Sequence, residues 1–188
     1  MKDSQDVINY LIKTYKYKRF LEIGVREGSI FRVDCDHKDG VDIDVNSDAN
    51  YKMSSDKFFE EIPKDQMYDI IFIDGEHEKS AVFRDIINSF KHLNPGGTIL
   101  CHDINPPEEW YLETTYCNNA WETWAELRST REDLEMFSLN VNMGPGIIRR
   151  GKQKLYKNKI EHTWEYLDAN RKELLNVLTL DEFFKKYK

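Results

Sequence analysis

The chain carries Phe20-Leu21-Glu22-Ile23-Gly24-Val25-Arg26-Glu27-Gly28, a short apolar run that ends in an acid and is followed by two glycines. A second run, Gly40-Val41-Asp42-Ile43-Asp44, places Asp42 twenty positions after Glu22. Glycine lets the backbone turn tightly and lets a ligand approach closely. An acid at the end of the next strand can accept hydrogen bonds from both hydroxyls of a ribose. The two runs therefore predict an α/β domain that binds a nucleoside.

The composition is typical of one acidic globular domain. With 188 residues, the chain is long enough for one domain with a core and too short for two ordinary ones. Its net charge of −7 argues against a nucleic-acid partner, because a surface for duplex nucleic acid needs a basic face. A basic stretch at 149–159 is interpreted as a solvated loop, with an anion-binding edge as the alternative.

The first residues and the cysteines indicate the cellular compartment. The first residues are polar, and no apolar run reaches membrane-spanning length, so we expect neither secretion nor a membrane partner. Three cysteines without paired spacing predict reduced thiols and a cytoplasmic protein. The oligomeric state stays open, because the first helix and the tail after Lys159 could cover the sheet within one chain or exchange in a homodimer.

Strand and helix patterns alternate along the chain. Strands are predicted at 20–23, 40–43, 51–53, 70–73, 98–101, 134–141 and 146–149, and helices at 3–16, 56–62, 82–93, 121–128, 164–178 and from Thr179 onward. This order predicts a doubly wound, mostly parallel seven-stranded sheet with helices on both faces, a Rossmann-like fold whose last strand is antiparallel. Residues 1–188 are expected to form a single domain, with an N-terminal helix (1–18), an α/β core (19–151), and a basic linker with C-terminal helices (152–188).

Polar residues follow the predicted strands where such sheets bind ligands, at their carboxyl ends. They are Glu22, Asp42, Ser55 with Asp56, Asp74 with His77, and His102 with Asp103. Each has an ordinary alternative as a surface acid, a helix cap or a loop pair. Together, carboxylates that crowd one edge repel each other and need a cation, a metal or hydroxyl donors nearby. S-adenosylmethionine offers a sulfonium, an ammonium and two ribose hydroxyls.

The sequence resembles the class I S-adenosylmethionine-dependent methyltransferases, and within them the small O-methyltransferases that include macrolide-sugar and catechol methyltransferases. The matching segments are Leu21-Glu22-Ile23-Gly24-Val25, Gly40-Val41-Asp42, Ser54-Ser55-Asp56, Phe72-Ile73-Asp74-Gly75-Glu76-His77, Leu93-Asn94-Pro95-Gly96-Gly97, Cys101-His102-Asp103 and Gly146-Ile147-Ile148-Arg149-Arg150-Gly151. They span residues 19–151. The glycine motif alone is a weak signal, but the ordered set is fairly specific.

The resemblance implies a role for each strand-end residue. The cofactor S-adenosyl-L-methionine would be bound by Glu22, Gly24, Gly28, Asp42, Ser55, Asp56 and Asp74. A divalent metal, Mg or Mn, would be bound by Asp74, His102 and Asp103. His77 would act as the catalytic base, with Asp74 as its catalytic partner. The catechol enzymes have Asp-Asn where this chain has His102-Asp103, so a softer ion than magnesium, or a second base at His102, is an alternative.

The expected function is that of a metal-assisted O-methyltransferase that modifies a hydroxyl of a sugar, a glycan or another small molecule. Trp110 and Tyr111 are candidates for an acceptor pocket, whereas Trp121 and Trp124 are expected to pack their helix on the sheet. A non-catalytic S-adenosylmethionine-binding module is one alternative. A nicotinamide-dependent oxidoreductase or epimerase is another, disfavoured because Gly24 and Gly28 enclose no further glycine of a Gly-x-Gly-x-x-Gly motif.

Overall fold

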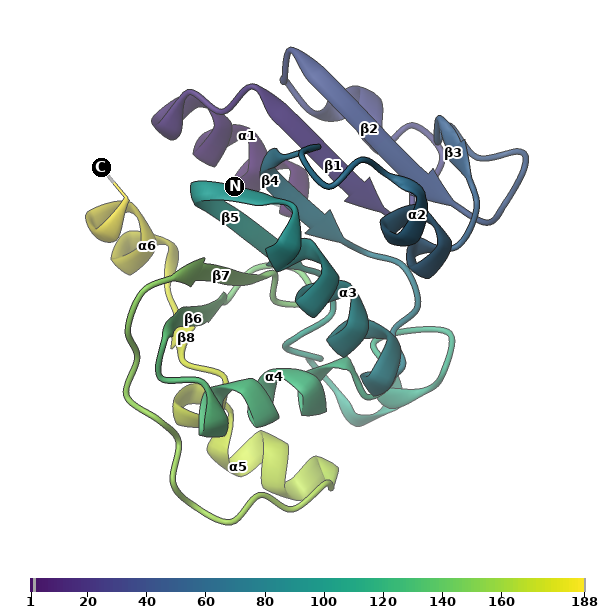
Figure 1. Ribbon diagram of the computed structural model, residues 1–188. Helices are drawn as coiled ribbons and strands as arrows, with labels where there is room; N and C mark the ends of the chain where they lie inside the picture. Colours follow the sequence, from purple (N-terminus) through teal and green to yellow (C-terminus); the bar gives the residue numbers. More distant parts are fainter. Residues whose placement is uncertain (2, 188) are drawn as a thin grey trace.

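The computed structural model describes residues 1 and 3–187, in which one mixed sheet lies between two layers of helices (Figure 1). The strand order is β3-β2-β1-β4-β5-β7-β6-β8. The strands are β1 (Arg19–Ile23), β2 (His37–Asp42), β3 (Tyr51–Lys52), β4 (Tyr68–Ile73), β5 (Leu93–Cys101), β6 (Leu134–Leu139), β7 (Gly146–Arg150) and β8 (Val177–Leu178). Strands β1 to β5 pair in parallel, and β7 pairs antiparallel with both β5 and β6. The predicted fold class is confirmed, with β8 as an additional short strand.

Helices cover both faces of the sheet. They are α1 (Ser4–Tyr15), α2 (Ser55–Glu61), α3 (Lys79–Lys91), α4 (Ala120–Thr130), α5 (Trp164–Leu174) and α6 (Leu180–Lys186). One apolar cluster joins Leu21 and Ile23 of β1 to side chains of α2, α3, α4 and α5. The other joins Phe20 of β1 to α1 and α6. Successive residues of β1 therefore face opposite layers, which explains why the central strands lack a polar alternation.

The helix boundaries correct several expectations. Ser54, rather than Asp56, caps α2. The helix predicted over 164–178 ends at Leu174, because Asn176 adopts a left-handed conformation (φ 52°) and turns the chain into β8. Strand β5 begins at Leu93, five residues before the strand predicted at 98–101. The last helix begins after its N-cap Thr179, as predicted, with a capping box in which Thr179 and Glu182 hydrogen-bond each other's backbone.

The remaining expectations concern single segments. Asp3 caps α1, and β6 and β7 pair antiparallel. Among the described residues, the longest helices are too short and too polar to cross a membrane. Within the basic stretch, Arg149 lies over the ring of Tyr15 and donates to its hydroxyl, at a distance of 2.7 Å. Lys152, Lys157 and Lys159 are exposed, as expected for a solvated loop.

Candidate active site

The turn after β1 packs directly on the end of β4. Gly24 has a φ of +81°, and a Cβ added there would lie 2.2 Å from the carbonyl oxygen of Asp74. The Gly24 amide donates to Val41, and the Asp74 amide donates to Ile23. Only glycine allows both this backbone conformation and this close approach. The local sequence thus brings the carboxyl ends of β1, β2 and β4 together.

We predict that Gly24→Ala lowers the free energy of unfolding by about 2 kcal/mol, because it combines a strained φ with a collision against backbone. Gly96→Ala is the matched control, since Gly96 has a φ of +80° but open space around its Cβ position. Thermal or urea unfolding should show the smaller loss for Gly96→Ala. If the two variants lose the same free energy of unfolding, the close approach of Gly24 to the Asp74 backbone makes no contribution to the cost of Gly24→Ala.

A cavity of about 600 Å³ opens at these strand ends. Five residues of the predicted cofactor set line it: Gly24, Asp42, Ser55, Asp56 and Asp74. Gly28 does not line it; its amide instead donates to Asp48. The turn after β1, the carboxyl ends of β2 and β4, and the start of α2 therefore line the same cavity.

Glu22 does not line this cavity either, although it lies close to it. Its side chain is 1% exposed, and neither carboxylate oxygen makes a hydrogen bond of normal geometry to the described residues. Burial raises the pKa of Glu22 to about 7; the nearby Ser29 hydroxyl acts in the opposite direction, and the charges of Asp74 and Asp42 add to the rise. A buried carboxylate with so few donors around it is costly, so this site favours a cation or several hydrogen-bond donors.

The cavity also includes residues that sequence reasoning missed. Arg26, Arg84 and Asp85 line it. Asp85 is 3% exposed, and its burial raises its pKa to about 6, while Ser55 offers a hydrogen bond that acts in the opposite direction. One signal was present in the sequence, because Asp85 interrupts the buried stripe of α3 between Val82 and Ile86.

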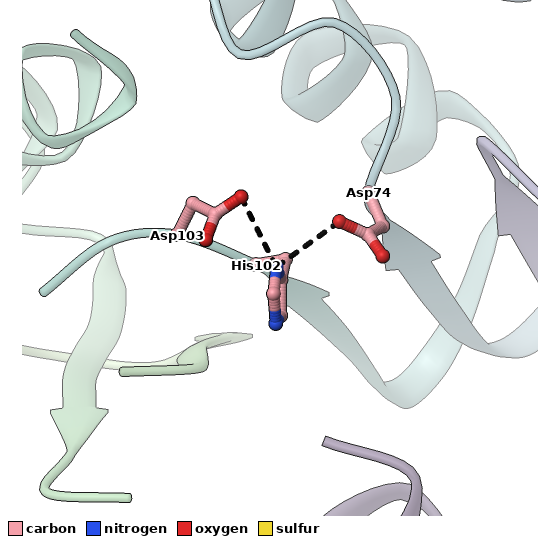
Figure 2. Close-up of side chains that lie close together, drawn as sticks. All are labelled: Asp74, His102 and Asp103. Atoms are coloured by element: carbon pink, nitrogen blue, oxygen red, sulfur yellow. Dashed lines mark ion pairs between the residues drawn. The ribbon is translucent and has the colours of Figure 1, made fainter. Parts of the chain in front are cut away.

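Beside the cavity, Asp74 meets two residues that follow β5. Figure 2 shows His102 between Asp74 and Asp103, with dashed lines to both carboxylates. The His102 Nδ1 atom lies 3.1 Å from Asp74 Oδ1 and 3.1 Å from Asp103 Oδ2. Asp103 has a φ of 60°, a left-handed conformation that aspartate tolerates, and this turn directs its carboxylate back to the cluster. The three predicted metal ligands are therefore adjacent, with their ligand atoms within 4.8 Å of one another.

The geometry of this cluster fits a divalent cation. Although close, Asp74 Oδ1 and His102 Nδ1 are buried and make no hydrogen bond of normal geometry. Ligand atoms that bind one ion at about 2.1 Å and at right angles lie about 3.0 Å apart, close to the observed spacing. Two carboxylates and one imidazole form a donor set that suits manganese or another transition ion better than an all-oxygen magnesium site.

His77 lies against the same acids. Its Nδ1 atom lies 3.0 Å from Asp103 Oδ2 and makes a close contact with the backbone carbonyl oxygen of Tyr116. Its Nε2 atom is buried, 3.5 Å from Asp74 Oδ1, and has no hydrogen-bond partner of normal geometry. With Nδ1–H donating to Tyr116, Nε2 is the nitrogen left to accept a proton.

Charge compensation holds this cluster together. Burial alone would lower the pKa values of His77 and His102, but the adjacent carboxylates raise both, that of His102 to about 10. Burial alone would raise the pKa values of Asp74 and Asp103, but the two histidines hold both below their usual range. Bound to the two carboxylates, a cation would replace the positive charge of the imidazoles.

Cys117 is a second residue that sequence reasoning missed. It is fully buried, and its Sγ donates to Asp103 Oδ1 at 3.3 Å. Burial raises the pKa of the Cys117 thiol, and the negative charge of Asp103 adds to this, so the thiol stays protonated and acts as a donor. No local motif in the sequence predicts the contact between two residues fourteen positions apart.

Comparisons with known proteins agree with this architecture. Residues 25–104 match a family model described as a methyltransferase domain. That range begins directly after Gly24 and contains Asp42, Asp74, His77, His102 and Asp103. No curated protein sequence matches the chain significantly.

Three solved structures share the fold. The methyltransferase PaMTH1 from Podospora anserina, bound to S-adenosylhomocysteine, is 16% identical, with a TM-score of 0.58 over 81% of this chain and 80% of that chain. The O-methyltransferase from Bacillus cereus in complex with S-adenosylhomocysteine is 15% identical, with a TM-score of 0.53 over 77% of this chain and 78% of that one.

The third is the methyltransferase MycE of the mycinamycin biosynthetic pathway, in complex with Mg and S-adenosylhomocysteine. It is 16% identical, with a TM-score of 0.51, and the match covers 78% of this chain but 49% of MycE. At such identities the likeness shows the fold alone, and the family model adds a similarity to a methyltransferase domain over residues 25–104. Residues 25–104 are thus similar to a methyltransferase domain, and the whole fold is that of structures known as methyltransferases.

Proposed function

We propose that this protein transfers the methyl group of S-adenosylmethionine to a hydroxyl of a sugar, a glycan or another small molecule, with help from a divalent cation. The observation that carries the proposal is the double role of Asp74. Its side chain lines the 600 Å³ cavity and also belongs to the cluster with His102 and Asp103. A cofactor in the cavity and a hydroxyl at the cluster would therefore meet at one residue.

The cavity offers suitable groups for each part of the cofactor. Asp42, at the end of β2, is placed to accept hydrogen bonds from the ribose hydroxyls. Ser55 and Asp56, at the start of α2, lie where the adenine would extend. Glu22, buried behind the turn with no hydrogen bond of normal geometry to the described residues, would provide the negative charge that an ammonium group needs. Bound S-adenosylhomocysteine in the structures with the same fold supports this assignment.

The chemistry at the cluster is that of hydroxyl activation. Asp74, His102 and Asp103 would hold the cation, which would lower the pKa of the acceptor hydroxyl and orient it. His77 accepts the hydroxyl proton at Nε2, while Tyr116 fixes the ring through Nδ1. A base placed in this way contributes about 10²–10⁴-fold to a rate. The site must then align the acceptor oxygen with the methyl carbon and the sulfur of S-adenosylmethionine.

Isothermal titration with S-adenosylhomocysteine tests the cofactor assignment. We expect binding in the micromolar range without metal, and a separate binding isotherm for Mn²⁺ that EDTA reverses. Addition of a hydroxylated acceptor and S-adenosylmethionine should give a product heavier by one methyl group. Failure of S-adenosylhomocysteine to bind, with and without Mn²⁺ or Mg²⁺, would contradict the proposed function.

Two wider expectations belong to this proposal. The described residues hold three free thiols, Cys35, Cys101 and Cys117, which supports a reducing, cytoplasmic setting. Residues 1–188 would form one domain, because α1 and α6, from the two ends of the chain, pack on the same face of the sheet. Gel filtration would distinguish the monomer from a homodimer.

A further inference from the structure

The segment between β5 and α4 contacts the cation cluster through Cys117. This segment includes the short helix η2 (Glu109–Leu112). The Cys117 side chain is fully buried, and its Sγ atom donates to Asp103 Oδ1 at 3.3 Å. The other oxygen of the same carboxylate, Oδ2, lies 3.1 Å from His102 Nδ1 and 3.0 Å from His77 Nδ1. The thiol therefore engages one oxygen of Asp103, and the second oxygen faces the two imidazoles.

Other contacts hold Cys117 in place independently of the cluster. Its amide donates to the carbonyl of Tyr111, on η2, at 2.9 Å. Two residues further on, the side chain of Asn119 accepts from the Lys79 amide at 2.7 Å, at the start of α3. These two contacts tie the segment to η2 and to α3. The position of the sulfur is thus set by the surrounding backbone and not by the carboxylate that it meets.

The Asp103 carboxylate depends on such a donor. Its side chain is 2% exposed, and a buried carboxylate oxygen without a hydrogen-bond donor is costly. A donor at Oδ1 also fixes the rotation of the carboxylate, so that Oδ2 stays directed at the place where the cation would bind. Partners that orient a metal ligand without touching the ion typically change the metal affinity 10–100-fold.

We infer that Cys117 is a positioning residue, which orients the carboxylate of Asp103 for the divalent cation. This inference rests on the proposed function and adds to it a residue that acts through Asp103. The carbonyl of the preceding residue, Tyr116, contacts His77 Nδ1. One dipeptide therefore holds a cation ligand through its side chain and the candidate base through its backbone.

Mn²⁺ titration of Cys117→Ala and Cys117→Ser, followed by electron paramagnetic resonance, tests the inference. Alanine removes the donor and should weaken Mn²⁺ binding about tenfold. Serine keeps a donor and should recover part of this loss. The spectrum of the bound Mn²⁺ should also change in Cys117→Ala, because Asp103 Oδ1 becomes free to approach the ion. Cys101→Ala is the matched control, since Cys101 is a buried free thiol that packs in the apolar core.

Alkylation of the original protein gives a second readout, which needs no variant. If the thiol contact strengthens cation binding, then cation binding must strengthen the contact by the same factor. Mn²⁺ should therefore slow the reaction of Cys117 with iodoacetamide about tenfold. Peptide mass spectrometry follows each thiol separately. Cys35, which is partly exposed, should react at the same rate with and without Mn²⁺.

Four outcomes would overturn the inference. The first two are an Mn²⁺ affinity of Cys117→Ala within about twofold of the original, and an equal loss in Cys101→Ala. The third is a Cys117→Ser variant that binds Mn²⁺ no better than Cys117→Ala, because the sulfur would then only fill space. The fourth is a thiolate-to-cobalt charge-transfer band on titration with Co²⁺, because Cys117 would then be a ligand itself.

Titration with S-adenosylhomocysteine separates this inference from the proposed function. Cys117 does not line the cofactor cavity, so a variant that binds S-adenosylhomocysteine as the original protein does is folded. If the original protein binds neither S-adenosylhomocysteine nor Mn²⁺, the proposed function fails. If it binds both, and Cys117→Ala binds both equally well, only the role of Cys117 is lost.

Discussion

Asp103→Asn is expected to weaken Mn²⁺ binding by about 100-fold and to lower methyl transfer by at least the same factor. The carboxylate of Asp103 lies 3.1 Å from His102 Nδ1 and 3.0 Å from His77 Nδ1, so it is central to both the cation site and the base. An amide keeps the shape but removes the negative charge. Asparagine also tolerates the left-handed backbone at this position, so the variant should fold.

The measurements are Mn²⁺ titration followed by electron paramagnetic resonance, and transfer of a labelled methyl group. Asp36→Asn is the matched control, because Asp36 has a 60% exposed side chain and pairs with Lys18 at the surface. Binding of S-adenosylhomocysteine to Asp103→Asn should change little, since Asp103 does not line the cofactor cavity. Unchanged Mn²⁺ affinity and unchanged turnover in Asp103→Asn would remove the cation site from the mechanism.

Much of the fold follows from short-range patterns. The strand at 70–73 has no polar alternation, and the structure buries it between α1 on one face and α3 on the other. The glycine turn and the acids after β1, β2 and β4 are predictable for the same reason, since parallel strands bring their carboxyl ends to one edge. Five of the seven residues predicted for the cofactor do line one cavity.

The parts that the sequence did not predict depend on long-range contacts. Strand β8 has two residues, and it exists because Asn176 turns the chain so that Val177 can pair with Ser138 of β6. The contact between His77 and the carbonyl of Tyr116 is made by backbone, which has no residue signature. Asp74 resembled a helix cap, yet Glu78 caps α3, and this leaves Asp74 available to the two histidines.

The roles of the strand-end acids differ because their surroundings differ. Asp74 and Asp103 lie beside imidazoles, which keep their pKa values low and their side chains ionised. Glu22 is as deeply buried but lies beside other acids, which together with burial raise its pKa to about 7. The same residue type therefore supplies a permanent charge at the cluster and a proton-dependent charge behind the turn.

Glu22→Gln should accordingly stabilise the ligand-free protein at high pH. The folded-state pKa of Glu22 is raised from 4.5 to about 7, so the folded state holds this proton more tightly than the unfolded state does. Stability that is fully present below pH 4.5 is then lost as the pH rises toward 7. The loss amounts to about 3 kcal/mol at pH 8, since one pKa unit corresponds to about 1.4 kcal/mol. Glutamine, neutral throughout, removes this dependence.

Urea unfolding at pH 5 and at pH 8 measures this effect. The variant and the original protein should have similar stability at pH 5, and the variant should be more stable at pH 8. Glu27→Gln is the control, because Glu27 is an exposed acid in the same turn. If Glu22→Gln shows no gain at pH 8, the carboxylate is already satisfied in the ligand-free protein.

The same substitution should weaken cofactor binding at pH 8 by about tenfold or more, the value of a charged hydrogen bond. In the original protein, the affinity for S-adenosylhomocysteine should fall about tenfold for each pH unit below 7, because the ammonium group of the ligand needs Glu22 ionised. Titration calorimetry at pH 6, 7 and 8 measures both trends. A variant that is more stable without ligand and binds the cofactor less tightly would show that the buried Glu22 carboxylate serves cation binding at the expense of the stability of the ligand-free fold.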